Sequence, residues 1–258
     1  MEIDYDSIKL QNKLGSGKFG RVFEGNIQDQ EVVYKILKYS INSNIFLNEI
    51  NIMKQLAHPN IPKLIGYCQK NSFYCIIIER CQGIDLLNFI EFYDISQRQK
   101  KHISIQLLNI IDYLHSICIL HRDIKPENIV VDLNTTNIKL IDFGISTFLI
   151  PPNKIKGIAG SIGYMAPEII KNEFYSYPCD IYSYGMTLFV LWSESMPRKR
   201  SQILYYLRDI RYKHIIYECL ELNPLKRPSL QRIGSFMQKI DGNDCNKKSI
   251  FDYLFFCC

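Results

Sequence analysis

Three groups of residues in this sequence have the types and spacing needed to bind and transfer phosphate. The first is the stretch KLGSGKFGRVFEG, in which Gly15, Gly17 and Gly20 allow backbone amides to come close to a large anion. The others are HRDIKPEN at residues 121–128 and DFG at residues 142–144, which supply carboxylates, cations and an amide. Carboxylates bind Mg2+ and cations neutralise phosphate charge, so together these groups indicate phosphoryl transfer.

The glycine-rich stretch differs from two common phosphate-binding motifs. A Walker A loop requires a glycine where Asn12 stands and a hydroxyl residue where Phe19 stands. A Rossmann fingerprint has the same glycine spacing but requires a helix after the glycines, whereas RVFEGNI has the composition of a strand. The order strand, loop, strand favours a hairpin that covers a triphosphate.

The order and spacing of the motifs resemble those of the protein kinase family. GSGKFGRV resembles the family's glycine-rich loop, VVYK its strand lysine, HRDIKPEN its catalytic loop and DFG its magnesium motif. GSIGYMAPE at residues 160–168 is similar to the end of an activation segment. The resemblance covers residues 8 to about 239 and implies a bilobal α+β fold, serine/threonine protein kinase activity, and the use of ATP and Mg2+.

The resemblance gives roles to the residues of the predicted catalytic site. Lys35 is expected to hold the α- and β-phosphates of ATP and to form an ion pair with Glu49. Asp123 is expected to orient the substrate hydroxyl or to accept its proton, and Lys125 to stabilise the transferring phosphoryl group. The two residues expected to bind Mg2+ are Asn128 and Asp142.

The resemblance also implies where the nucleotide binds. Adenine is expected between Val22, Val33 and Val130, with Ile78 as the gatekeeper. Most kinases have alanine where Val33 stands, so its two extra methyl groups should narrow the roof of the pocket. The other expected nucleotide contacts are Leu14, Gly15, Gly17, Gly20, Lys35, the hinge residues Glu79 and Cys81, and Asp85.

The segment after DFG departs from the family in a way that bears on regulation. Between residues 145 and 160 the only hydroxyl side chains are Ser146 and Thr147, and Gly157 stands where an activating phosphate usually sits. Arg122 of the catalytic loop therefore has no phosphate partner in the sequence. We predict activity that does not depend on phosphorylation of this segment.

Other features bear on the substrate and on the packing of the predicted C-lobe. Lysine two residues after the catalytic aspartate, together with Ser161, is typical of serine/threonine kinases. About two dozen residues separate Trp192 from Ile215, fewer than the family usually has, so the substrate-side helix there is expected to be trimmed. The structural groups that the resemblance implies are a pair of Glu168 with Arg227, a brace from Asp180 to the catalytic loop, and a spine of Met53, His121 and Phe143.

The elements that must position these residues change in class along the chain. Residues 8–37 and 73–80 have the β-branched, aromatic and turn residues of strands. Residues 44–57 and the stretches LLNFIEFY and ISQRQKKHISIQLLNIIDYLHSI have helical periodicity. We therefore predict two lobes and a tail: an N-lobe at 8–79, a hinge at 79–84, a C-lobe at 85–239 and a tail at 240–258.

The composition disfavours several classes of protein. The 258 residues are 47% hydrophobic, enough for a substantial core, and the formal net charge is only +5, so nucleic-acid binding is not expected. The nine cysteines are scattered without a CxxC pair, and the acidic N-terminus does not resemble a signal peptide. No apolar run is long enough to span a membrane. We predict a reduced, cytoplasmic monomer that acts on protein substrates.

Two alternative functions and three interpretations of the tail stay open. A pseudokinase scaffold has the same fold, but such proteins typically lose Lys35, Asp123 or Asp142, and all three are present. A kinase of small molecules or lipids is disfavoured by KPEN and GSIGYMAPE, which shape a peptide-binding surface in the family. The tail ends in Cys257 and Cys258. Its three interpretations are packing of its aromatic residues on the domain, disorder, and a lipid on the cysteines that gives weak membrane association.

Overall fold

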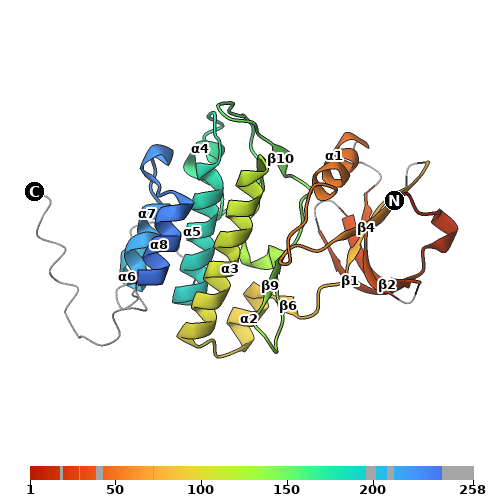
Figure 1. Ribbon diagram of the computed structural model, residues 1–258, viewed down its shortest axis with the longest axis horizontal. Helices are drawn as coiled ribbons and strands as arrows, with labels where there is room; N and C mark the ends of the chain where they lie inside the picture. Colours follow the sequence, from red (N-terminus) through yellow and green to blue (C-terminus); the bar gives the residue numbers. More distant parts are fainter. Residues whose placement is uncertain are drawn as a thin grey trace, which may run out of the picture.

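The structure is a computed structural model, and it describes residues 1–17, 20–28, 30–38, 43–71, 73–195, 202–207 and 212–239. These residues form two lobes of different class (Figure 1). The smaller lobe is a β-sheet with an α-helix, and the larger lobe is mostly helical. The predicted bilobal α+β fold is confirmed, whereas the predicted tail with Cys257 and Cys258 lies outside the described residues.

A five-stranded antiparallel sheet forms the smaller lobe. Its spatial order is β1-β2-β3-β5-β4, and its strands are β1 (Leu10–Ser16), β2 (Gly20–Ile27), β3 (Gln30–Leu37), β4 (Leu64–Lys70) and β5 (Phe73–Glu79). Side chains alternate along the central strand β3, so Val32 and Tyr34 enter a small core with Cys75, while Lys35 points to the other face. The sequence predicted the strands within 8–37 and 73–80, but it did not predict β4.

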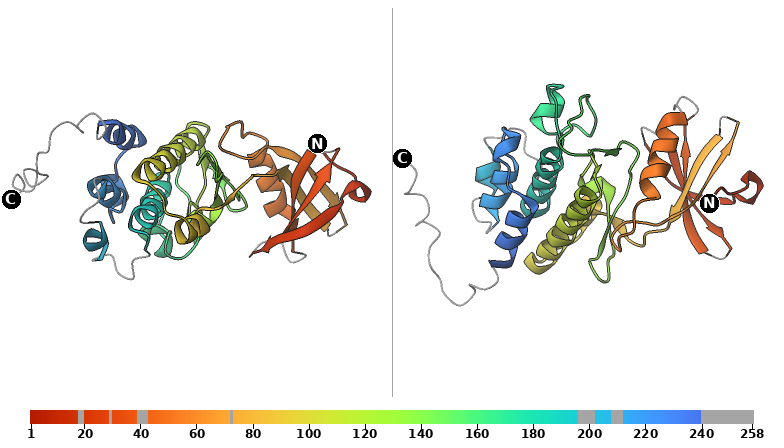
Figure 2. Two further views of the ribbon diagram at one scale, coloured as in Figure 1. Left: turned by 90° about the horizontal axis from the view of Figure 1, so that it is seen from below. Right: turned by 45° about the horizontal axis from the view of Figure 1, so that its top comes forward.

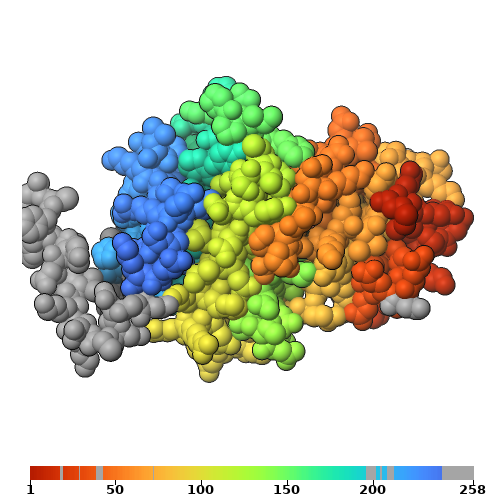
Figure 3. All heavy atoms as spheres, viewed as in Figure 1, coloured from red at the N-terminus to blue at the C-terminus, as the bar shows by residue number. Residues whose placement is uncertain are grey.

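Helix α1 (Ser43–Met53) packs against the sheet through the buried residues Phe46 and Ile50 (Figure 2). It ends four residues before the predicted end at residue 57. The chain beyond it is instead held by the hydroxyl of Tyr113 on α3 (Gln97–Ser116), which accepts from the amide of Ala57 at 2.7 Å. In Figure 3 the chain that follows α1, in orange, lies directly against α3, in yellow-green.

The larger lobe is built around α3 and α5 (Pro178–Ser193), which lie side by side (Figure 1). Helix α3 begins with a capping box formed by Ser96 and Gln99. Nearly all of α5 is buried, which explains why its sequence is apolar on every side. No helix in the described ranges is long and apolar enough to cross a bilayer. The remaining helices are α2 (Leu86–Phe92), α4 (Pro167–Ile170), α6 (Ile203–Tyr206), α7 (Lys213–Cys219), α8 (Leu230–Lys239) and the 3-10 turns η1 (Tyr5–Ser7), η2 (Pro126–Asn128) and η4 (Pro224–Lys226).

Two small sheets place the two polar segments next to each other. One contains β6 (Ile84–Asp85), β8 (Ile129–Val131) and β9 (Ile138–Leu140), and in the other β7 (Ile119–Leu120) pairs with β10 (Thr147–Phe148). The segment 121–128 joins β7 to β8, and the segment 142–144 lies between β9 and β10. Because β7 pairs with β10 and β8 pairs with β9, the two loops begin and end side by side.

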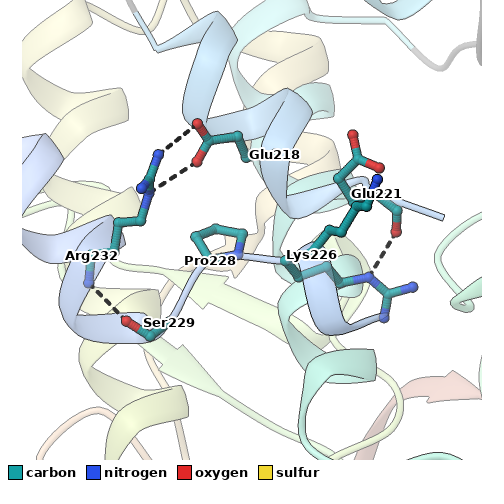
Figure 4. A pocket seen from close by; sticks show the side chains of 7 residues that line it. Glu218, Glu221, Lys226, Pro228, Ser229 and Arg232 are labelled. Carbon is teal, nitrogen blue, oxygen red and sulfur yellow. Dashed lines mark hydrogen bonds and ion pairs between the residues drawn. The ribbon is translucent and has the colours of Figure 1, made fainter. Parts of the chain in front are cut away.

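A surface cavity of about 470 Å³ lies in the larger lobe, where α7, η4 and the start of α8 meet (Figure 4). It is lined by charged side chains, among them Arg232, which forms an ion pair with Glu218, and Arg227, which is held by Glu168. None of the residues that line it belongs to the predicted catalytic or nucleotide site. The cavity therefore has no part in the site described next.

Candidate active site

Lys35, Glu49 and Asp142 meet at the junction of the two lobes. The Nζ atom of Lys35, on β3, lies 2.6 Å from a carboxylate oxygen of Glu49 on α1. The same atom lies 2.7 Å from Oδ1 of Asp142, in the loop after β9. A Cβ atom at Gly144 would lie within 3.2 to 3.3 Å of all three polar groups, so glycine leaves them the room to meet. One lysine from the smaller lobe is thus shared by two carboxylates, one from each lobe.

The charges in this group determine its protonation. Burial by itself would lower the pKa of Lys35, but the charges of Glu49 and Asp142 outweigh burial and raise it. Burial raises the pKa of Glu49 in spite of the lysine. Burial would also raise the pKa of Asp142, but the charge and hydrogen bond of Lys35 hold it below its usual value. Asp142 is therefore an anion at neutral pH, as a ligand of Mg2+ must be.

Asp123, Lys125 and Asn128 lie close together in the loop between β7 and β8. The side-chain nitrogen Nδ2 of Asn128 donates to the backbone carbonyl oxygen of Asp123 at 2.8 Å and to Oδ2 of Asp123 at 3.0 Å. Lys125 Nζ lies 3.7 Å from the same Oδ2 and donates to the hydroxyl of Ser161 at 2.7 Å. The other oxygen, Oδ1 of Asp123, is buried without a hydrogen-bond partner in the described part of the chain. A buried carboxylate oxygen without a donor is costly, and the hydroxyl of a substrate is a donor that suits it.

Asp180 on α5 fixes the start of this loop. Its carboxylate accepts the backbone amides of His121 and Arg122, both at 2.9 Å, and lies 3.1 Å from Nε2 of His115. Burial would raise the pKa of Asp180, but the hydrogen bond and charge of His115 and the bonds to the loop hold it below its usual value. The predicted brace is therefore confirmed. The residues of the predicted spine, Met53, His121 and Phe143, are all buried. The ring centroids of His121 and Phe143 lie 5.0 Å apart.

Arg122 turns its guanidinium toward the segment after DFG. It adopts a left-handed conformation with φ of 70°, and its Nε donates to the carbonyl oxygen of Ile145 at 2.6 Å. Its Nη1 donates to the hydroxyl of Tyr175 at 3.2 Å. Sequence reasoning missed this partner, because Tyr175 is 53 residues further along and no motif or spacing links the two.

The predicted adenine contacts come from three strands. Val22 on β2 lies opposite Lys35, Val33 on β3 lies opposite Ile78, and Val130 on β8 lies opposite Asp85. All three valines are half-buried, so each retains exposed apolar surface. Strand pairing therefore places Val22 and Val33 on the same face of the sheet as Lys35.

The three glycines of the glycine-rich loop differ in what a side chain at their position would contact. A Cβ atom at Gly15 or Gly17 would meet nothing within 4 Å, so close packing does not require glycine at either position. A Cβ atom at Gly20 would lie only 2.1 Å from the carbonyl oxygen of Ile36, so this glycine is required by strand packing. Leu14, just before the loop, is 51% exposed. The amide of Gly17 donates to the carbonyl oxygen of Gly20 at 2.9 Å, so the turn of the loop is closed by its own backbone.

The hinge is braced by ion pairs that the sequence did not predict. Glu79 lies 2.6 Å from Lys139 of the larger lobe. Its neighbour Arg80 forms an ion pair with Glu24 on β2, in the smaller lobe. Burial raises the pKa of Cys81 to about 11, which keeps its thiol protonated. Consecutive hinge residues are thus tied to opposite lobes.

Asp85 and the pair of Glu168 and Arg227, all singled out in the sequence, stabilise the larger lobe. The carboxylate of Asp85 caps helix α2 by accepting the amide of Asn88 at 2.9 Å. The predicted pair of Glu168 and Arg227 is confirmed, with two hydrogen bonds of 2.5 and 2.7 Å between nearly unexposed side chains. It ties the end of the segment 145–168 to the turn before α8.

The oxygen donors at the site suit a magnesium ion that arrives with phosphate. Among the described residues, no cluster of three or more His, Cys, Asp or Glu side chains is arranged to hold a metal. Asn128 and Asp142 offer an amide and a carboxylate from adjacent loops. Mg2+ in phosphate-transferring sites is usually bound by one or two protein carboxylates, with phosphate oxygens and water as the other ligands. The donor set therefore fits Mg2+ bound together with a nucleotide.

Comparisons with known proteins point the same way as the geometry. Residues 8–237 match the family model described as protein kinase domain. The chain is 35% identical over 244 residues to calcium-dependent protein kinase 6 of Plasmodium berghei, a match that covers 91% of this chain and 16% of that protein. It is 32% identical over 225 residues to the Aurora kinase of Saccharomyces cerevisiae, covering 83% and 59% of the two chains. It is 28% identical over 273 residues to a serine/threonine/tyrosine-protein kinase of Arabidopsis thaliana, covering 96% and 69%.

Proposed function

Because the chain belongs to the protein kinase family, we propose that it transfers the γ-phosphoryl group of Mg-ATP to serine or threonine hydroxyls of protein substrates. The single observation that carries the proposal is Oδ1 of Asp123, a buried carboxylate oxygen without a hydrogen-bond partner in the described residues. An acceptor of this kind orients an incoming hydroxyl and takes its proton as the new P–O bond forms, while the bond from the γ-phosphorus to the β,γ-bridging oxygen breaks and ADP leaves. Serine and threonine rather than tyrosine are supported by Lys125, which Ser161 holds beside Asp123.

The other residues of the site act by position and charge. Lys35, fixed between Glu49 and Asp142, presents a cation to the α- and β-phosphates. Asp142 and Asn128 are the proposed ligands of Mg2+, which supplies charge neutralisation at the phosphates when bound. The proposed nucleotide contacts are Leu14, Gly15, Gly17, Gly20, Val22, Val33, Lys35, Glu79, Cys81, Asp85 and Val130.

We also infer that activity does not require phosphorylation of the activation segment (residues 145–168). Lys35 contacts Glu49, and Asp180 holds the catalytic loop, through side chains of the chain itself. Ser146, one of the two hydroxyl side chains between residues 145 and 160, is fully buried. The arrangement that phosphorylation would have to produce is thus supported by contacts within the chain.

The remaining inferences concern the protein as a whole. We infer a reduced, intracellular monomer that acts on proteins and not on nucleic acid. The cysteines in the described ranges are all free thiols, and burial raises the pKa of Cys75 and Cys219, which keeps them unreactive. Membrane attachment through Cys257 and Cys258 rests on the sequence alone. Light scattering on the purified protein tests whether it is a monomer, and mass spectrometry of its C-terminus tests whether Cys257 and Cys258 carry a lipid.

The first experiment is transfer of labelled phosphate from ATP and Mg2+ to a generic basic protein. Asp123→Ala is expected to reduce transfer by a factor on the order of a hundred or more. Asp112→Ala removes an exposed carboxylate of α3 and serves as the matched control with unchanged activity. Phosphatase treatment beforehand should leave the wild-type rate unchanged. Nucleotide binding without transfer would favour the scaffold function instead.

A further inference from the structure

Two tyrosines between α4 and α5 fasten the activation segment to the body of the larger lobe. Tyr175 exchanges two backbone hydrogen bonds with Ile155, at 2.9 and 3.0 Å. The hydroxyl of Tyr177 donates to the carbonyl oxygen of Leu149. The backbone amide of Leu149 donates to the carbonyl oxygen of Cys118 at 2.8 Å. The segment is therefore held at two points along its middle, each by one of these tyrosines.

The side chain of Tyr175 connects the first of these points to the catalytic loop. Its ring is 2% exposed and packs in a small core with Leu149 and Met165. Its hydroxyl accepts from Nη1 of Arg122 at 3.2 Å. The backbone amide of Arg122 is in turn fixed by Asp180 at 2.9 Å. A continuous path of contacts thus runs from α5 through Arg122 and Tyr175 to the middle of the activation segment.

Arg122 needs acceptors, because a partly buried guanidinium loses its hydration and must be compensated by hydrogen bonds. Within the described residues those acceptors are neutral oxygens, the carbonyl of Ile145 at 2.6 Å and the hydroxyl of Tyr175, and no carboxylate forms an ion pair with Arg122. An anion would be the stronger acceptor. Neither hydroxyl residue between 145 and 160 is placed to become one, since Ser146 is buried and Thr147 is part of β10.

We propose that Tyr175 is a positioning residue that does the work of a phosphate on the activation segment. Its hydroxyl holds Arg122 and its backbone holds Ile155, so the segment and the catalytic loop keep one relative position in the unmodified chain. A phenol is a permanent acceptor, whereas a phosphate is added and removed. This inference rests on the proposed function, because positioning of the segment matters only where a protein substrate is bound.

Tyr175→Phe tests the proposal, because it keeps the buried ring and the backbone bonds to Ile155 and removes only the hydroxyl. Loss of a hydrogen bond to a charged group is expected to lower kcat by a factor on the order of ten. The KM for ATP should change by less than about twofold, because Lys35 and the hinge are not touched. Hydrogen exchange of the amides at 150–157 should become faster, since the segment loses its link to the catalytic loop.

The matched control is Tyr184→Phe. Tyr184 lies fully buried on α5 and its hydroxyl donates to the carbonyl oxygen of Ser104 at 3.1 Å, but it contacts neither Arg122 nor the activation segment. This variant should lose stability and keep both kcat and the exchange rates at 150–157. A second test introduces Tyr175→Phe into an Arg122→Ala background, where it should cause no further loss of kcat, because the hydroxyl acts through the arginine.

Two results would overturn the proposal: unchanged exchange at 150–157 in Tyr175→Phe, or additive losses of kcat in the Arg122→Ala background. If Tyr175→Phe does not fold, Arg122→Ala alone must show the faster exchange. Exchange is measured without ATP and again in Asp123→Ala, so this arm does not depend on phosphoryl transfer. An inactive wild type whose exchange still depends on the hydroxyl would refute the proposed function and leave the positioning role standing.

Discussion

Two arginine–glutamate pairs whose arginines line the same surface cavity differ mainly in burial, and they allow the energetic effect of burial to be measured within one protein. Figure 4 shows the more exposed pair, Arg232 and Glu218. Arg227 and Glu168 have side chains that are 0% and 4% exposed. Arg232 and Glu218 have side chains that are 64% and 37% exposed. In both pairs two arginine nitrogens contact the carboxylate, at 2.5 and 2.7 Å in the buried pair and at 3.1 and 2.8 Å in the exposed pair.

The buried pair should be far more sensitive to the loss of one charge. Glu168→Gln leaves the Arg227 guanidinium buried with neutral acceptors: the new amide oxygen, the carbonyl oxygens of Glu221 and Pro178, both at 2.9 Å, and that of Leu222 at 3.5 Å. Removing one partner of a buried ion pair typically costs about 3–5 kcal/mol. We expect about 3 kcal/mol here, because glutamine keeps one acceptor oxygen. Glu218→Gln should cost less than about 1 kcal/mol, as exposed pairs do.

Urea denaturation of the two variants and of the wild type, followed by circular dichroism, gives the two free energies of unfolding from midpoints and slopes. The same comparison at high salt should reduce the small effect of Glu218→Gln further and leave that of Glu168→Gln unchanged, since salt screens only exposed charges. Equal losses in the two variants would refute the reasoning from burial. So would a salt-dependent loss in Glu168→Gln.

Two further predictions concern acid stability and the hinge. The pKa of Asp180 is held below its usual value, so its contribution to stability is present above about pH 4 and is lost as the pH falls further. Asp180→Asn should therefore be less stable than the wild type at neutral pH, and this difference should become smaller as the pH falls below about 4; urea titrations that give the same difference at every pH would contradict this. Because the Arg80–Glu24 pair ties the hinge to β2, Arg80→Glu and Glu24→Arg should each weaken nucleotide binding severalfold and the double variant should restore it. Titration with a fluorescent ATP analogue measures this, and a double variant no better than either single variant would speak against a role for the pair.

The elements with a strong local pattern were predicted from the sequence, and those without one were not. Helix α3 has both amphipathic periodicity and the Ser96–Gln99 capping box, so its existence and its start follow from local residues. Strand β4 has the sequence LIGYCQK, which includes a glycine, lacks strict alternation and pairs with β5 through an irregular register near Leu64. Its place at the sheet edge depends on β5, which no local pattern of β4 encodes.

The same division applies to the candidate site. Lys35, Asp123 and Asp142 are found by their motifs, because the chemistry fixes both the residue type and the neighbours in the sequence. The partners that tune them are not found this way. The links between Arg122 and Tyr175, and between Arg80 and Glu24, each span more than fifty residues and use residue types that are common on any surface. Only the folded chain brings them together.

The conformation of Asp142 explains why a motif specifies the residue but not its state. Its φ of 65° lies in the left-handed region, which costs a residue other than glycine roughly 1–3 kcal/mol. Two contacts of its carboxylate oppose that cost: the amide of Gly144 at 3.2 Å, inside the motif, and Lys35 at 2.7 Å, which lies 107 residues earlier. The first contact is encoded locally, but the second needs the folded chain, which brings Lys35 on β3 of the smaller lobe to the loop; Glu49 on α1 contacts the same lysine at 2.6 Å. The left-handed conformation of Asp142 is therefore supported by a residue of the other lobe, which the motif itself does not specify.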